Sequence, residues 1–259
     1  MGHQRLKKPP RSRWWDQVVE LLDDGGTADE IAATTARAID DALADAARDP
    51  ALTETVLLLA ALPGAARQSD FREALRALGV ASRADPSLID LLSALDRTID
   101  REARMRGNRT DFGELAQLAA ANSITGTLTP TLPTLFGTSP ADVKAALARL
   151  DNPDRFARLS RAFFADLIRR SLDYYLSRAY ARHVGPGETF ASIRSQDEFR
   201  AALSDHCYET ALIVERYSAD WFSKAKFEGG ITRSRATVLA RTALKKLRRE
   251  LSNRNRADA

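Results

Sequence analysis

Apolar residues recur along most of this chain with the three-to-four-residue period of an amphipathic helix. From Phe156, for example, the apolar stripe continues through Leu159, Phe163 and Leu167. No segment shows the strict alternation of apolar and polar residues that is typical of a half-buried strand. The pattern therefore predicts an all-α protein of about eight to ten helices, arranged as two abutting bundles.

Residues that favour helix ends divide this pattern into separate elements. Thr27 and Glu30 have the spacing of a capping box, and Asp70 is a helix cap that is followed nine residues later by Gly79. The pairs Asp85-Pro86, Ser139-Pro140 and Asn152-Pro153 each place a cap before a proline at the first helical position. Predicted helices cover residues 27–48, 70–79, 110–122, 152–187, 196–225 and 232–252, and further helices begin after Pro86 and Pro140.

One long interruption and a change in aromatic content suggest the domain organisation. Residues 123–138 combine glycine, proline and threonine without helical period, and 14 of the 18 aromatic residues follow position 122. We therefore expect a basic flexible arm at 1–13, an alanine-rich helical bundle at 14–122, an ordered connecting loop at 123–138, and an aromatic-rich bundle at 139–259 that ends in a basic helix.

Charge is distributed unevenly along the 259 residues. The net charge of +4 is the balance of +5 at residues 1–13, +7 at residues 231–259 and −8 between them. Basic ends on an acidic body indicate localised contacts with anions. The single cysteine, Cys207, is typical of a reducing compartment, and no window approaches 18 uncharged apolar residues. We expect a soluble, cytoplasmic protein without a transmembrane segment.

The final predicted helix presents the clearest candidate binding surface. Its apolar stripe includes Ala236, Ala243, Leu244, Leu247 and Leu251, whereas the opposite arc carries Arg241, Lys245, Lys246, Arg248 and Arg249. One face can dock on the protein while the other contacts nucleic acid, an acidic protein or an anionic membrane, with membrane insertion the least favoured. Docking of the cations against the acidic body is the structural alternative. Trp221 on the preceding helix adds an aromatic contact to the partner-binding set.

Two arginines lie on the apolar stripe of the 152–187 helix, where a leucine would be expected. Arg170 and Arg178 project within about 40° of that stripe, so each needs a carboxylate, a ring face or a ligand. His206 lies on the apolar face of the next helix. Two interpretations remain for the histidine: a hydrogen-bonded core residue, or an internal polar cluster with Arg170 and Arg178.

Arg178 and His183 have the spacing of the Arg-x4–6-His signature, and residues 140–251 resemble HEPN-type domains in this motif and in all-helical character. The resemblance implies a metal-independent ribonuclease that often dimerises, with Arg178 and His183 as its catalytic pair. Ala179 departs from the polar residue that commonly follows the arginine in that family, and Arg200 and His206 also fit the spacing.

The remaining residue patterns limit other kinds of chemistry. His206 and Cys207 point about 100° apart on a helix, and His206 with Glu209 supplies only two ligands, so no metal site is expected. No cofactor motif is present in the sequence. A non-enzymatic module that binds an anionic partner is the leading hypothesis; the HEPN-like ribonuclease and a structural subunit of a larger assembly are the alternatives. A homodimer through the C-terminal bundle is a further expectation.

Overall fold

A computed structural model describes residues 11–107, 109–133, 137–180, 183, 189–190 and 192–253, and within these ranges the protein is all-α, as predicted. One 3-10 turn, Thr129–Thr131, follows α7. The helices are α1 (Arg13–Asp23), α2 (Ala28–Ala38), α3 (Asp40–Ala46), α4 (Pro50–Ala66), α5 (Phe71–Ala77), α6 (Leu88–Arg106), α7 (Asp111–Leu128), α8 (Pro140–Arg149), α9 (Pro153–Tyr180), α10 (Ile193–Thr210), α11 (Leu212–Phe227) and α12 (Arg233–Asn253).

Most of the expected helix caps are present. Thr27 and Ser139 each form a full capping box, with Glu30 and Asp142 respectively. The side chain of Asp70 accepts a hydrogen bond from the backbone of Glu73, which satisfies one free donor in the first turn of α5. After α5, Gly79 adopts a positive φ of 76°, a conformation that glycine reaches without a steric cost.

Several predicted boundaries were wrong. The 27–48 helix is divided at Ile39 and the 196–225 helix at Ala211, so the described chain has more helices than the eight to ten expected. The cap of α6 is Ser87 rather than Asp85. Helix α7 continues through Leu128, so the predicted connecting loop begins six residues later than expected. Helix α9 covers Pro153–Tyr180 of the predicted 152–187 helix; beyond it His183 is described, and residues 181–182 and 184–187 lie outside the described residues.

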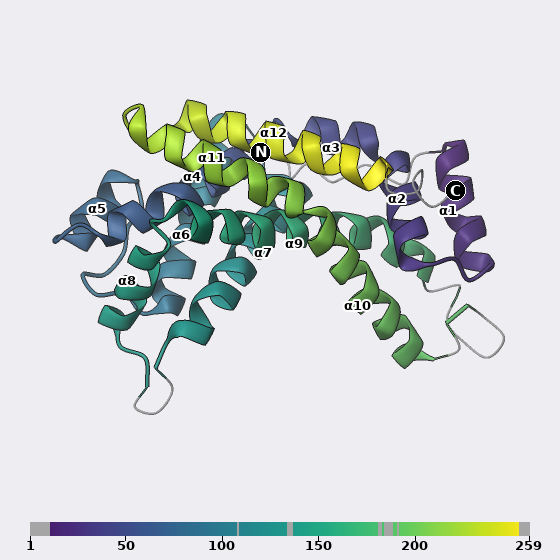
Figure 1. The fold of residues 1–259 in the computed structure, drawn as a ribbon, viewed down its shortest axis with the longest axis horizontal. Coiled ribbons are helices and arrows are strands. Elements are labelled where there is room, and N and C mark those ends of the chain that lie inside the picture. Colours follow the sequence, from purple (N-terminus) through teal and green to yellow (C-terminus); the bar gives the residue numbers. More distant parts are fainter. Residues whose placement is uncertain are drawn as a thin grey trace.

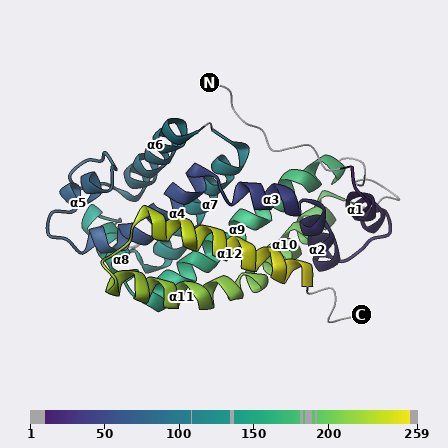
Figure 2. The ribbon, with the colours of Figure 1, turned by 90° about the horizontal axis from the view of Figure 1, so that it is seen from above.

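The long helices form a layer along the length of the molecule. Figure 1 shows α9 running below α11 and α12, with α7 and α10 descending from it on either side like the legs of an arch. Seen from above, α11 and α12 lie side by side (Figure 2), and the two helices are in contact. Helices α5, α6 and α8 gather at one end, and α1 and α2 at the other.

A single buried core connects helices from both halves of the sequence. It extends from Val18 in α1 to Leu251 in α12. The C-terminal helix α12 packs against α4 and α2, and α10 also packs against α2. The division into two bundles remains a prediction, but the two sets of helices share extensive contacts. Of the predicted basic arm, residues 1–10 lie outside the described residues, whereas Ser12 caps α1 and Arg13 is its first residue.

Candidate functional site

The apolar stripe of α12 docks the helix onto the protein, as its sequence predicts. The side chains of this stripe are fully buried: Ala236, Leu239, Ala240, Ala243, Leu244, Leu247 and Leu251. They repeat every three or four residues, so they lie on one side of the helix and contact α2, α4 and α11. The helix is therefore a fixed support for the polar side chains on its other face.

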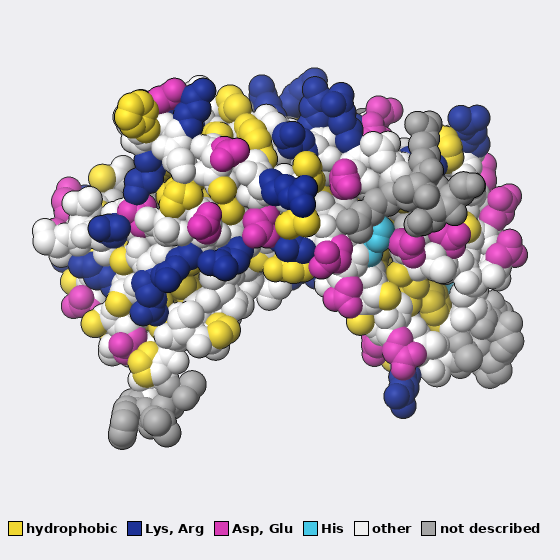
Figure 3. Space-filling view, viewed as in Figure 1, with side chains coloured by type: hydrophobic (Ala, Val, Ile, Leu, Met, Phe, Trp, Pro, Cys, Tyr) yellow, Lys and Arg dark blue, Asp and Glu magenta, His cyan; other side chains and the backbone are white. Residues whose placement is uncertain are grey.

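Three cations form a row on the outer face of α12. Arg241, Lys245 and Arg249 are exposed and follow one another at intervals of four residues. Together with Arg48 they line a shallow groove of about 660 Å³ between α3 and α12. Figure 3 shows Lys and Arg side chains gathered along the top of the molecule, where α12 and α3 lie in Figure 1. None of the three cations in the row has an ion-pair or ring partner among the described residues.

The other two predicted contact residues of α12 are held by internal partners. Arg248 donates from Nε to Asp40 Oδ1 at 2.8 Å and also pairs with the second carboxylate oxygen. Lys246 Nζ lies 5.6 Å from the centroid of the Tyr217 ring on α11. Of the five basic residues that the sequence predicts on one face, three therefore point outward and two attach α12 to its neighbours.

Cations at the beginning of α12 are also used inside the fold. Arg233 pairs with Glu54 on α4 and with Glu102 on α6. Arg235 donates to the backbone carbonyls of Ala225, Glu228 and Gly230, which lie at the end of α11 and in the turn that follows. Sequence reasoning missed these roles because the partners of Arg233 are on helices far away in the chain. Part of the +7 charge of residues 231–259 is thus neutralised or satisfied internally.

Trp221, which was predicted to contact a partner, packs toward the core. Its ring centroid lies 6.0 Å from that of Phe156 on α9, and Phe156 in turn stacks on Phe222 at 4.4 Å. Trp221 is half-buried by these contacts. The aromatic side chain that α11 does expose is Phe227 in its last turn, which is 92% exposed.

Arg178 and His183 contact different partners in the structure. Arg178 is exposed and lies 4.8 Å above the ring of Tyr174, whose hydroxyl it contacts at 3.0 Å. The same hydroxyl donates to Asp111 on α7 at 2.8 Å. His183 is buried, and its Nδ1 is 3.2 Å from Asp23 Oδ1 at the end of α1. Arg178 therefore contacts a residue of its own helix, α9, whereas His183 contacts the end of α1.

The predicted internal cluster of Arg170, Arg178 and His206 is also divided among separate contacts. Arg170 donates from Nε to Asp166, one turn earlier on α9, at 2.7 Å. His206 is half-buried and lies close enough to Asp29 on α2 to contribute to its lowered pKa, although the hydrogen bond from Thr27 is the larger cause. The stripe arginines therefore have intrahelical partners, and His206 is directed toward α2.

A polar cluster does exist in this region, but it is centred on Arg169. Its guanidinium contacts Asp166 Oδ1 and Asp173 Oδ2, each at 2.7 Å. Burial raises the pKa of Asp173, and Arg169 opposes that effect. Burial also raises the pKa of the nearby Cys207 thiol to about 12. Such a thiol stays protonated at neutral pH, so the cluster provides no ready nucleophile, and the ion pairs of Arg169 lie within α9.

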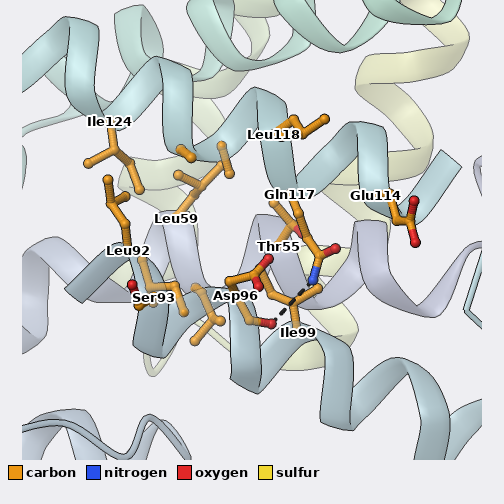
Figure 4. A pocket seen from close by; sticks show the side chains of 14 residues that line it. Thr55, Leu59, Leu92, Ser93, Asp96, Ile99, Glu114, Gln117, Leu118 and Ile124 are labelled. Atoms are coloured by element: carbon orange, nitrogen blue, oxygen red, sulfur yellow. Dashed lines mark hydrogen bonds between the residues drawn. The ribbon is translucent and has the colours of Figure 1, made fainter. Parts of the chain in front are cut away.

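A second hollow lies between α6 and α7 and was not expected from the sequence. Its volume is about 440 Å³, and its floor is apolar, with Leu59, Leu92 and Ile124 among the side chains that line it (Figure 4). At one end the Gln117 side chain donates to the backbone carbonyl of Asp96 at 3.2 Å. Burial and the nearby Asp100 raise the pKa of Asp96. This hollow therefore presents apolar side chains beside the carboxylate of Asp96, a group that can bind a cation.

No protein-family model matches this chain, and no curated protein or solved structure shows significant similarity to it. Within the described ranges, no helix has the length and apolar composition needed to cross a membrane. In the same ranges, His, Cys, Asp and Glu side chains form no group of three or more that could hold a metal ion. The geometry of the charged surfaces therefore provides the basis for a functional proposal.

Proposed function

We propose that this protein is a non-enzymatic helical module that binds a polyanion through the outer face of α12. The observation that supports this function is the row formed by Arg241, Lys245 and Arg249, which are exposed and lack ion-pair partners within the described chain. Most other arginines of the later helices are engaged by carboxylates, carbonyl oxygens or rings. A cation with no internal partner is available for an external anion.

The row has the geometry of a linear electrostatic contact. At 1.5 Å rise per residue, the positions from Arg241 to Arg249 span about 12 Å along the helix axis. Because the apolar face of α12 is fully buried, the helix that carries the cations is already ordered before binding, and only their exposed side chains lose freedom. The net charge of −8 on residues 14–230 disfavours a polyanion over much of the remaining surface.

Nucleic acid is the polyanion that we favour over an acidic protein. Arginine and lysine line the groove together with Asn253, whose amide group is a typical donor to phosphate and sugar oxygens, whereas the Ser252 hydroxyl donates to the Arg248 carbonyl at 2.9 Å. Such contacts position a nucleic-acid backbone without reading its sequence. We therefore expect binding that depends weakly on sequence and strongly on salt.

The test is fluorescence anisotropy with labelled single- and double-stranded RNA and DNA over a range of salt concentrations. Replacing Arg241, Lys245 and Arg249 together with glutamine should weaken binding at least tenfold at low salt and reduce the slope of log K against log salt by about two to three. A matched triple variant, Arg72→Gln, Arg97→Gln and Arg216→Gln, removes the same charge from exposed positions on α5, α6 and α11. It should bind almost like the wild type.

Equal losses in the two triple variants would mean that net charge alone governs binding, and would overturn the proposal. Poly-glutamate is the comparison probe for an acidic protein partner. Binding of poly-glutamate in the absence of any nucleic-acid binding would favour that alternative. RNA that is cleaved in EDTA, with the loss of cleavage in both Arg178→Ala and His183→Ala, would instead establish the HEPN-like ribonuclease.

The proposal includes two further expectations, one about the oligomeric state of the protein and one about its cellular compartment. Phe227 is 92% exposed and Val238 52% exposed, so the C-terminal helices have apolar side chains that support a homodimer or a place in a larger assembly. Sedimentation at increasing protein concentration tests the homodimer. The only cysteine is buried, which supports a reducing, cytoplasmic setting.

A further inference from the structure

A second basic surface lies around a hollow at the junction of α7, α8 and α9. The hollow has a volume of about 440 Å³. Its apolar part is formed by Leu128, Ala146 and Leu150, each of which is at least nine-tenths buried. Thr127 and Thr131 add hydroxyl groups to the wall. None of these elements belongs to the α12 groove, so the two surfaces are separate.

Three exposed arginines, Arg149, Arg155 and Arg158, line this hollow. Two of them are arranged by backbone contacts: Arg149 donates to the carbonyl of Thr131 at 3.4 Å, and Arg155 donates to the carbonyl of Arg149 at 3.3 Å. Figure 3 shows a band of Lys and Arg side chains over the region where α8 and the beginning of α9 lie in Figure 1.

The charges of these arginines are not balanced by acids. No aspartate or glutamate lines the hollow, and none of the three guanidinium groups forms an ion pair with the described part of the chain. The adjacent acid, Asp151, is engaged by Arg67 at 3.6 Å and by Lys226 at 2.6 Å. By contrast, Arg169 and Arg170 on the same helix α9 each pair with Asp166. A partly apolar hollow that is lined by three guanidinium groups and by no acidic residue is suited to an anion.

We propose that this hollow binds a small organic phosphate, a phosphomonoester attached to an apolar body. Guanidinium groups bind phosphate through paired, charge-assisted hydrogen bonds, which favours phosphate as the head group. Leu128, Ala146 and Leu150 form an apolar base that is almost fully buried, so the apolar contacts for the rest of the ligand come mainly from the methyl groups of the threonines and the methylene stems of the arginines. The volume is in the range of small-molecule sites. Inorganic phosphate alone would leave the apolar surface uncovered.

Calorimetric titration of the full chain tests this site, with hexyl phosphate, adenosine monophosphate, inorganic phosphate and hexanoate as the probes. At least one organic phosphate should bind at least tenfold more tightly than inorganic phosphate and hexanoate. The comparison with inorganic phosphate measures the contribution of the apolar body to binding, and the comparison with hexanoate measures that of the phosphate head group. A preference for hexyl phosphate indicates an aliphatic body, and a preference for the nucleotide indicates a flat ring that stacks on a guanidinium.

Variants locate the binding to the hollow. The double variant Arg149→Gln and Arg158→Gln should weaken binding of the organic phosphate at least tenfold, because it removes two charge-assisted contacts. The control double variant, Arg72→Gln and Arg97→Gln, removes the same charge from α5 and α6 and should leave binding unchanged. Circular dichroism and thermal melting establish that each variant is folded, and the substituted side chains are all exposed.

Three results would overturn this proposal. These are the absence of binding by either organic phosphate at millimolar concentration, equal binding of inorganic phosphate or hexanoate, and equal weakening by the two double variants. The site is also independent of the function proposed for α12. The triple variant at Arg241, Lys245 and Arg249 should bind the organic phosphate as the wild type does, so failure of one proposal is distinguishable from failure of the other.

Discussion

The guanidinium of Arg233, in the first turn of α12, lies 2.5 Å from the carboxylate of Glu54 in α4. The Glu54 side chain is only 2% exposed, whereas that of Arg233 is 31% exposed. Burial raises the pKa of Glu54, and the neighbouring Arg233 acts in the opposite direction. This contact joins the basic C-terminal helix to the centre of the N-terminal half of the chain.

Replacing Arg233 by methionine should destabilise the protein by about 3 kcal/mol at neutral pH, because the buried Glu54 carboxylate then lacks its cation. Urea denaturation followed by circular dichroism measures the loss. Arg241→Met is the matched control on the same helix: Arg241 is exposed and lines the open groove, so its replacement should cost less than about 0.5 kcal/mol. Similar losses in both variants would contradict the structural role of the pair.

The same pair predicts the sign of a pH dependence. The folded-state pKa of Glu54 is raised above its ordinary value of 4.5, so the folded protein holds this proton more tightly than the unfolded chain does. The contribution of Glu54 to stability is therefore most favourable below pH 4.5 and declines as the pH rises through its folded pKa. Loss of Arg233 should raise the folded-state pKa of Glu54 further and so make stability decline more as the pH rises.

The loss of unfolding free energy caused by Arg233→Met should consequently be smaller near pH 4.5 than at neutral pH. Urea denaturation over this pH range provides the measurement. Adding Glu54→Gln to the variant removes the titrating group, and the extra pH dependence should disappear with it. A deficit that stays constant with pH would assign the effect of Arg233 to packing rather than to charge.

Local signals made much of the helical fold predictable. The Thr27–Glu30 and Ser139–Asp142 boxes act within one turn, so sequence spacing is sufficient to locate them. The breaks at Ile39 and Ala211 have no glycine or proline to mark them. Conversely, Gly126 lies inside α7, where the packed helix continues through a residue of weak helical propensity. Tertiary packing determined these boundaries.

The candidate site was predictable only in part, for a related reason. The buried stripe of α12 follows from its period, and so does the presence of cations on the opposite arc. Which cations remain available depends on contacts between distant segments: Arg248 pairs with Asp40, 208 positions away in the chain. No local pattern indicates such a partner. The hollow lined by Arg149, Arg155 and Arg158 likewise requires three helices to meet.

Cys207 should be protected from alkylation in the folded protein. Its side chain is fully buried, and burial raises the pKa of the thiol to about 12, so the reactive thiolate is scarce. Iodoacetamide should modify the native protein only as fast as it unfolds, and mass spectrometry with and without urea measures this. A variant with Cys207→Ser and Ser223→Cys moves the thiol to an exposed position on α11 and should react rapidly. Equally rapid reaction of the native thiol would contradict the burial of Cys207.

His183 should contribute to stability rather than to catalysis. Its Nδ1 contacts Asp23, its backbone N–H donates to Tyr180 at 3.0 Å, and its carbonyl accepts from Phe190 at 2.8 Å. His183→Ala should lower the unfolding free energy by about 1–2 kcal/mol through the lost side-chain contact. Arg178→Ala removes an exposed contact with Tyr174 and should cost less than about 1 kcal/mol. Thermal denaturation measures both, and RNA incubated with wild type in EDTA should remain intact.

Asp40 should restrain polyanion binding at the α12 groove. Its carboxylate lies in the groove and engages Arg248 through two contacts. Asp40→Asn removes a repelling charge and releases Arg248, so affinity for labelled nucleic acid should rise about three- to tenfold at low salt and less at high salt. Asp41→Asn makes the same change at the next position of α3, which does not line the groove, and should have a smaller effect. The two variants share the loss of one acidic residue from the first turn of α3, so a change in helix stability affects both. If Asp40→Asn binds no better than Asp41→Asn, the polyanion does not occupy the groove between α3 and α12.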